Sequence, residues 1–251
     1  MQTWKSQDIP DKWKSSPASI KKYMPTWKYH LMTDEMNRNF VIKYFPEFLQ
    51  YYDNFKYAIQ RADAIRYLYL YVNGGLYIDL DMEITESLEP LFIVNHPLLF
   101  KYNSIDYQQS GILFLSKSAN YPSLTNSIMA SIPHHPIWIH IINAMKETLP
   151  FYVIGKHWQV MVSTGPNGVD RTIKTHNIKY NLLDPELINS GNICNMASNK
   201  NAIVRSLEGG SWHSWDSKIF GFCRCNIYSC TLIMILIIIS IIILFIVIIF
   251  R

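Results

Sequence analysis

The chain has 251 residues, with 23 Lys and Arg against 19 Asp and Glu, so its formal net charge is +4. Its 10 Gly, 12 Pro and 4 Cys exclude a collagen-like chain, a low-complexity chain and a disulfide-rich miniprotein. A small and scattered positive charge also argues against a nucleic-acid partner, which would require clustered Lys and Arg. The length predicts one globular domain with a substantial core and short appendages.

Short elements are predicted in the first fifty residues. Residues 28–32 (KYHLM) form a plausible short strand. Thr33 is a candidate N-cap for a helix that continues through Glu35, because its hydroxyl can accept a hydrogen bond from a free backbone N–H. Pro46 interrupts the helical pattern of residues 37–49.

A longer helix is predicted over residues 55–72. Small and apolar residues recur there at spacings of 4, 3, 4 and 3, which indicates one buried helical face: Ala58, Ala62, Ile65, Tyr69 and Val72. Asp63 and Arg66 are three residues apart and therefore share a neighbouring face. Asn73, Gly74 and Gly75 then end the helix, because glycine adopts the left-handed closing conformation at little cost.

The next segment, residues 76–84, alternates with period two, as expected for a strand. Its even-numbered residues are apolar, and the opposite face carries Tyr77, Asp79, Asp81 and Glu83. Helices that alternate with short strands predict an α/β layered domain. Asp79 and Asp81 would then project the same way, and such paired carboxylates recruit a cation such as Mg²⁺ or Mn²⁺ that clamps a diphosphate. For an isolated D-x-D, a solvated strand face is the simpler explanation.

The surrounding sequence favours the functional interpretation. The run IQRADAIRYLYLYVNGGLYIDLDMEI (residues 59–84) resembles the DXD-containing sugar-binding region of glycosyltransferases. Among these, the chain is similar to the yeast initiating α-1,6-mannosyltransferase and, more closely, to the inositol-phosphoceramide mannosyltransferases. The resemblance covers residues 2–217 and includes further blocks in the expected order: QTWK at 2–5, WKY with LMTD at 27–34, NSIMAS with HP at 126–136, STGP at 163–166 and GSWHSW at 210–215.

The resemblance implies a GT-A-like fold, in which helices flank a mixed sheet, and retaining transfer from a nucleotide sugar with Mn²⁺ or Mg²⁺. It assigns Asp79 and Asp81 to the metal and the donor diphosphate, with His213 as a further metal ligand. It also assigns Asp63 and Arg66 to the donor's sugar or ribose and its phosphates. The catalytic residues implied are therefore Asp63, Asp79 and Asp81.

The same resemblance places Gly74, Gly75 and Trp4 at the donor. Simpler roles stay open for several residues: Asp63 and Arg66 could form a surface ion pair, and Trp212 and Trp215 could belong to the core. Two departures from the family pattern stand out. Relatives usually begin with a strand of the type IPKIIH before QTW, and this chain begins at Met1; and Ser127 stands where relatives often carry Asp.

The C-terminal residues 231–250 (TLIMILIIISIIILFIVIIF) are almost entirely apolar, and Thr231 and Ser240 are the exceptions. A helix of this length matches the roughly 30 Å hydrocarbon core of a bilayer. We therefore predict a glycosyltransferase domain over 1–222, a juxtamembrane segment with three cysteines over 223–230, and a single transmembrane helix over 231–250. The resemblance implies the Golgi, whereas the flanking charges leave the orientation open.

Together these features predict a membrane-bound retaining glycosyltransferase, which transfers mannose from GDP-mannose to a lipid-linked or glycan hydroxyl such as that of an inositol phosphoceramide. Two alternatives remain from the sequence alone. One is a tail-anchored, non-catalytic scaffold on a decayed transferase fold, which the missing first strand motivates. The other is a phosphatase that uses D-x-D as nucleophile and acid, although Glu83 stands where such enzymes carry Thr or Val.

Overall fold

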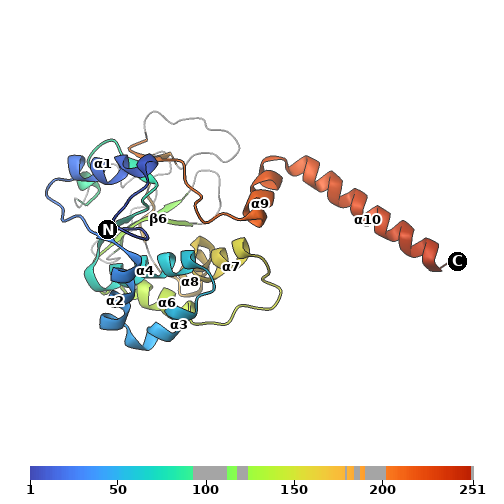
Figure 1. Cartoon of the computed structure of the whole chain (residues 1–251), viewed down its shortest axis with the longest axis horizontal. Coiled ribbons are helices and arrows are strands. Elements are labelled where there is room, and N and C mark those ends of the chain that lie inside the picture. Colours follow the sequence, from blue (N-terminus) through green and yellow to red (C-terminus); the bar gives the residue numbers. More distant parts are fainter. Residues whose placement is uncertain (93–111, 118–123, 179, 184–186, 190–201, 250–251) are drawn as a thin grey trace.

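The computed structural model describes residues 1–92, 112–117, 124–178, 180–183, 187–189 and 202–249. Figure 1 shows a body in which short strands are flanked by helices, and a C-terminal helix that projects away from that body. The predicted α/β class is confirmed by this arrangement.

The described strands form three small sheets. They are a parallel pair of β1 (Gln2–Thr3) and β2 (Leu31–Met32), an antiparallel sheet in the order β3 (Gly75–Ile78), β6 (Leu124–Ser131), β5 (Ile112–Lys117), and a mixed sheet in the order β4 (Met82–Ile84), β8 (Val204–Ser206), β7 (Ile188–Asn189). In the third sheet β8 is antiparallel to β4 and parallel to β7.

The described α-helices are α1 (Ser15–Tyr23), α2 (Asp34–Tyr44), α3 (Leu49–Asn54), α4 (Ala58–Asn73), α6 (Pro136–Ala144), α7 (Lys156–Ser163), α8 (Pro166–Thr175), α9 (Trp215–Cys225) and α10 (Ile227–Ile249). The predicted cap of α2 is confirmed, since Thr33 Oγ1 accepts a hydrogen bond of 3.3 Å from the backbone N of Met36. The helix ends at Tyr44, two residues before Pro46. The predicted strand at residues 28–32 is reduced to its last two residues.

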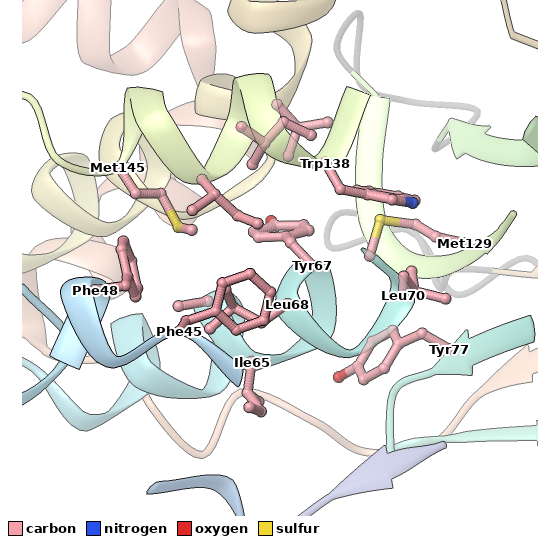
Figure 2. Close-up of a cluster of buried hydrophobic side chains, with 14 of the residues drawn as sticks. Phe45, Phe48, Ile65, Tyr67, Leu68, Leu70, Tyr77, Met129, Trp138 and Met145 are labelled. Atoms are coloured by element: carbon pink, nitrogen blue, oxygen red, sulfur yellow. The ribbon is translucent and has the colours of Figure 1, made fainter. Parts of the chain in front are cut away.

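Helix α4 is the centre of the larger hydrophobic core. Figure 2 shows Tyr67 of α4 between that helix and α6, where its ring stacks on Trp138 with centroids 6.0 Å apart. The helix was predicted in the right place but with the wrong buried face. Of the five residues expected to be buried, Ile65 is buried, whereas Ala58 is exposed. The reason is that α4 contacts α2, α6, α7 and the sheet strands β3 and β6, so its buried residues do not form a single stripe.

The predicted single strand over residues 76–84 is wrong. Strand β3 ends at Ile78 and pairs with β6, whereas β4 begins at Met82 and pairs with β8. Between them the chain turns, and the backbone N of Met82 donates to the carbonyl of Asp79 over 3.1 Å. Asp79 and Asp81 therefore lie at the point where two sheets separate, not on one continuous strand.

Gly74 ends α4 as predicted, with φ of 62°. A Cβ at this position would lie 2.6 Å from the backbone nitrogen of Pro133, so glycine is required by close packing as well as by conformation. The turn thereby brings β3 back along α4, and the end of β3 reaches the side chains of that helix.

The C-terminal region consists of two helices with a sharp bend. In the part of the chain that the structure describes, no single helix combines the length and hydropathy of a membrane span. Residues Trp215–Cys225 and Ile227–Ile243 satisfy these criteria only as a pair, and the two helices are bent by 107°. The predicted single transmembrane helix is thus not established by the structure.

Candidate functional site

A cavity of about 230 Å³ lies beside the turn between β3 and β4. Its walls come from the N-terminal segment, α4, β3 with the turn after it, β6, α7, the start of α8 and the segment after β8. The lining residues used below are Trp4, Trp13, Asp63, Arg66, Tyr77, Asp79, Asp81, Asn126, Val160, Met161 and Trp212. Five of them were assigned to the site from the sequence: Trp4, Asp63, Arg66, Asp79 and Asp81.

Arg66 is the central cation of this cavity and is only 4% exposed. Its Nη2 lies 2.9 Å from Oδ1 of Asp63, and its Nη1 lies 3.0 Å from Oδ1 of Asp79. Nη1 also donates to the carbonyl of Asn126 over 2.7 Å, and the ring of Tyr77 lies 4.6 Å from the guanidinium carbon. One arginine therefore links α4, the end of β3 and β6 through charge-assisted hydrogen bonds.

Asp63 is buried on the same side, so the alternative of a surface ion pair with Arg66 is excluded. Its Oδ1 accepts a hydrogen bond from Asn126 Nδ2 (3.1 Å), and its Oδ2 accepts one from Thr164 Oγ1 (3.0 Å). Burial raises the pKa of Asp63 to about 6, although the adjacent Arg66 guanidinium pulls that pKa down. A carboxylate held by three neighbours has a fixed orientation, which suits the recognition of a hydroxyl group.

The two acids of the D-x-D sequence have different surroundings. Asp79 accepts hydrogen bonds from Arg66 and from the hydroxyl of Tyr77, and burial still raises its pKa. No side chain in the described structure donates to Asp81; its pKa is raised to about 7, first by burial and then by the charge of Asp79. Arg66 pairs with Asp63 and Asp79, whereas among the described residues no ion pair is formed by Asp81, so the site keeps negative charge that a ligand can neutralise.

These surroundings fit a divalent cation held by two protein carboxylates. Mg²⁺ and similar ions commonly bind one or two carboxylates and complete their shell with phosphate oxygens and water. Among the residues that the structure describes, no group of three or more His, Cys, Asp and Glu side chains is close enough to hold a metal. His213 is accordingly not brought together with Asp79 and Asp81, and its role as a metal ligand stays a prediction.

The segment after β8 covers the turn that bears the acids. The backbone N of Leu207 donates to the carbonyl of Asp81 over 2.7 Å, and the indole of Trp13 donates to the carbonyl of Glu208 over 2.8 Å. A Cβ built on Gly209 would overlap Oδ2 of Asp81. Residues 207–209 therefore lie directly on Asp81, and glycine is needed at position 209 for the carboxylate to keep its place.

The residues that follow this segment, from Trp212 to Ser217, pack on α7. The ring of Trp212 lies parallel to that of His157, with an interplanar angle of 8° and centroids 5.7 Å apart. The backbone N of His157 donates to Oδ2 of Asp216 over 2.7 Å, and Nδ1 of His157 lies 3.2 Å from Oγ of Ser217. Trp212 is thus a wall of the cavity, whereas Trp215 is 73% exposed and belongs neither to the cavity nor to the core.

Three further residues assigned from the sequence can now be placed. Trp4 lines the cavity and meets Trp13 edge-on at 4.9 Å. Gly74 and Gly75 do not line it; they shape the turn between α4 and β3, one step away from the site. Their predicted contact with the donor stays a prediction.

Several site residues were missed by sequence reasoning, among them Asn126, Thr164, Tyr77 and His157. Asn126 and Thr164 fall inside blocks that resemble the family, which is the signal that could have found them. Ser127, by contrast, is not in the cavity. Its hydroxyl lies 2.8 Å from that of Thr125, and these two residues share the face of β6 opposite to Asn126. An Asp at this position would lie on that opposite face.

Known proteins resemble this chain over the same region. Residues 10–103 match the family described as "Glycosyltransferase sugar-binding region containing DXD motif". The chain is 34% identical to Inositol phosphoceramide mannosyltransferase 2 of Schizosaccharomyces pombe over 165 residues, which are 66% of this chain and 42% of the relative. It is 32% identical to Mannosyl phosphorylinositol ceramide synthase SUR1 of Saccharomyces cerevisiae over 238 residues, which are 92% of this chain and 55% of the relative.

The chain thus spans about half the length of the relatives it matches. Among solved structures, PaToxG Glycosyltransferase superposes with a TM-score of 0.46 and 17% identity, over 70% of this chain and 67% of that chain. The D-x-D acids Asp79 and Asp81 and the A-D-x-x-R residues Asp63 and Arg66 fall within the residues that match the family. The chain therefore belongs to the family of glycosyltransferases whose sugar-binding region contains a DXD motif, and inositol phosphoceramide mannosyltransferases are among its relatives.

Proposed function

We propose that the chain is a retaining glycosyltransferase that transfers mannose from GDP-mannose to a hydroxyl of an inositol phosphoceramide-type sphingolipid. The observation that carries this proposal is the buried Arg66, which holds Asp63 and Asp79 at one wall of a cavity that also contains Asp81. The printed names of the relatives supply the sugar and the class of acceptor. A glycan hydroxyl is the second acceptor class.

Asp79 and Asp81 are the residues that would hold a divalent cation, Mn²⁺ or Mg²⁺. Support comes from the raised pKa values of both carboxyls: burial raises the pKa of each, and the charge of Asp79 further raises that of Asp81. A bound cation would favour the charged form of both groups. When bound, the cation supplies positive charge beside the diphosphate that departs. His213 remains a candidate for a further ligand.

The other side chains of the cavity would bind the donor, stabilise charge and exclude water. Asp63, oriented by Asn126 and Thr164, accepts hydrogen bonds from hydroxyls of the donor. Arg66 keeps Asp79 in position and contributes positive potential where the diphosphate gains charge. Trp4 and Trp212 contribute apolar walls that exclude water.

The proposed reaction breaks the bond between the anomeric carbon and the diphosphate oxygen and forms a bond from that carbon to the acceptor oxygen. The acceptor enters on the face from which the diphosphate leaves, so configuration is retained. An oxygen of the diphosphate receives the acceptor's proton, and this route requires no side-chain base.

Attachment to a membrane, in the Golgi by analogy with the relatives, is the last part of the proposal. The support lies in α10, whose described side chains are apolar and exposed apart from a few polar ones near its start and Ser240. The hydroxyls of Thr231 and Ser240 each donate to a backbone carbonyl one turn earlier, over 2.8 Å. Pairing inside the helix lowers the cost of placing these hydroxyls in hydrocarbon.

Donor turnover by the full chain in detergent tests the function. We would measure nucleoside diphosphate release from GDP-mannose, UDP-galactose, UDP-glucose and UDP-N-acetylglucosamine, with Mn²⁺ or with chelator, and with or without inositol phosphoceramide. Mn²⁺-dependent release from GDP-mannose that rises with the lipid is the expected result. Asp81→Asn should abolish it, and the matched variant Glu83→Gln should retain it, since Glu83 does not line the cavity. Release that is unaffected by Asp81→Asn would overturn the assignment.

A further inference from the structure

Helix α9 presents its apolar stripe to solvent instead of to the body. Trp215, Ile219 and Phe222 are spaced by four and three residues, so they share one face, and all three are exposed. The opposite side of α9 packs on α7, where Phe220 lies 4.9 Å from His157 and 5.1 Å from Trp158 between ring centroids. A helix that only stabilised the body would bury this stripe.

A second apolar segment lies next to α9. Phe151, Tyr152 and Ile154 precede α7 and are exposed, and Phe151 reaches 94%. A Cβ at Gly155 would lie 2.9 Å from Oδ2 of Asp216, so this segment and the start of α9 are neighbours. In Figure 1 the loop before α7 and helix α9 both lie at the end of the body from which α10 extends. We call the six residues of the two segments the apolar rim: Phe151, Tyr152, Ile154, Trp215, Ile219 and Phe222.

The direction of α9 matches the plane of a bilayer. The bend between α9 and α10 is 107°, so a bilayer normal along α10 would place α9 close to the membrane plane. Four of the six rim residues are aromatic, and Trp and Tyr prefer the headgroup level of membranes. Lys218, exposed beside the stripe, can extend toward lipid phosphates.

We infer that the apolar rim lies in the headgroup region of a lipid bilayer and sets the height of the cavity above the membrane. Trp212 lines the cavity three residues before Trp215, and Val160 and Met161 of α7 line it from the helix on which α9 packs. The rim therefore holds two walls of the cavity near the level at which a sphingolipid exposes its headgroup hydroxyls. This inference rests on the proposed function for its acceptor and on α10 for the direction of the membrane.

Tryptophan quenching by brominated lipids tests the inference in the full chain. All seven Trp residues precede residue 216, so α10 contributes no signal. The protein would be reconstituted into phosphatidylcholine and phosphatidylinositol vesicles whose acyl chains carry bromine near the headgroup. We expect quenching in the wild type and a loss of about half of it in Trp215→Phe, because Trp215 is the single tryptophan among the six rim residues and is 73% exposed. The matched variant Trp27→Phe, which replaces a half-buried tryptophan packed on Phe92, should keep it.

Extraction of the same vesicles with alkaline carbonate reports membrane retention separately. A retained protein whose quenching is absent, or is the same in Trp215→Phe as in the wild type, would overturn the inference. Quenching does not depend on turnover, so an inactive enzyme with a quenched Trp215 would count against the proposed function and leave the rim at the membrane. A second variant set extends the test: Ile219→Ser with Phe222→Ser should reduce quenching, and Met36→Ser with Ile42→Ser on the exposed face of α2 should not.

Discussion

Nη1 of Arg66 lies 3.0 Å from Oδ1 of Asp79, although Arg66 belongs to α4 and Asp79 follows β3. The contact exists because the Gly74–Gly75 turn reverses the chain tightly enough for the end of β3 to reach the middle of the preceding helix. The A-D-x-x-R and D-x-D sequences are therefore two halves of one local unit, and the unit is completed by Asn126 from β6.

The first prediction concerns this pair. Arg66→Lys keeps the charge but cannot bind Asp63 and Asp79 at once with a rigid fork. We expect the free energy of unfolding to fall by about 2–3 kcal/mol, the cost of losing one buried charge-assisted hydrogen bond or more. Urea denaturation of the full chain in detergent measures this.

Arg38→Lys is the control, since Arg38 also binds one carboxylate with two nitrogens, at 2.9 and 2.8 Å from Asp53, but at the surface. An exposed pair of this kind contributes about 0–1 kcal/mol. Equal losses in the two variants would show that burial of Arg66 has no energetic consequence.

The second prediction is a pH dependence. The pKa of Asp63 is raised to about 6 in the folded chain, above the value of about 3.9 expected when unfolded. Folding therefore favours the protonated carboxyl: its stabilising contribution is complete below about pH 4 and is lost as the pH rises through about 6. Relative to Asp63→Asn, the wild type should lose up to about 3 kcal/mol of unfolding free energy between pH 4 and 7.

Asp53→Asn is the comparison, because stability should change with pH in the opposite direction at this residue. The hydrogen bond from Arg38 lowers the pKa of Asp53, so here the wild type should gain stability relative to its variant as the pH rises from the acid range. A difference between wild type and Asp63→Asn that stays constant from pH 4 to 7 would contradict a raised pKa at Asp63.

The third prediction concerns the cover over the acids. In Gly209→Ala the new methyl group must displace the Asp81 carboxylate, which it would otherwise overlap. Mn²⁺-dependent donor turnover should fall by at least about tenfold, as for other small displacements of a reacting group. The unfolding free energy should change by less than about 1 kcal/mol because position 209 is exposed. Glu208→Ala, which alters an exposed side chain next door, should leave turnover unchanged.

The fourth prediction concerns the stack that holds Trp212. His157→Ser removes the ring that lies parallel to the indole, and an aromatic pair of this kind contributes about 1 kcal/mol. The KM for the donor should therefore rise about fivefold while kcat stays unchanged. His157→Phe should restore most of the wild-type KM, because it keeps a ring beside Trp212 and loses only the contact of Nδ1 with Ser217; Nε2 has no hydrogen-bond partner in the described structure. A KM that stays high in the Phe variant would point to the imidazole itself.

Local patterns in the sequence predicted those features that depend on neighbours in the chain. The cap at Thr33, the position of α4 and the glycine turn after it follow from the nearest few residues. The grouping of Asp63, Arg66, Asp79 and Asp81 was predicted from the family resemblance, and the turn explains it in geometric terms.

Features that depend on distant segments were not predicted. Alternation over residues 76–84 indicated one strand. In the structure the first half, β3, pairs with β6 and the second half, β4, pairs with β8, and each partner follows its half by more than forty residues in the chain. Period-two alternation carries no information about which partner a strand will find. Thr164, His157 and the Gly209 cover likewise reach the site through tertiary packing, so their roles became clear only from the contacts.

The hydrogen bond from the Trp13 indole to the carbonyl of Glu208 joins residues that are 195 positions apart. A ribosome releases Trp13 early and Glu208 only near the end of the globular body. A growing chain can therefore form the contacts of Arg66 with Asp63 and Asp79 well before residues 207–209, which lie on Asp81, have been synthesised. During synthesis the charged side chains of the cavity can therefore come together first. The segment after β8 covers them later, and the cavity is completed among the last steps of folding.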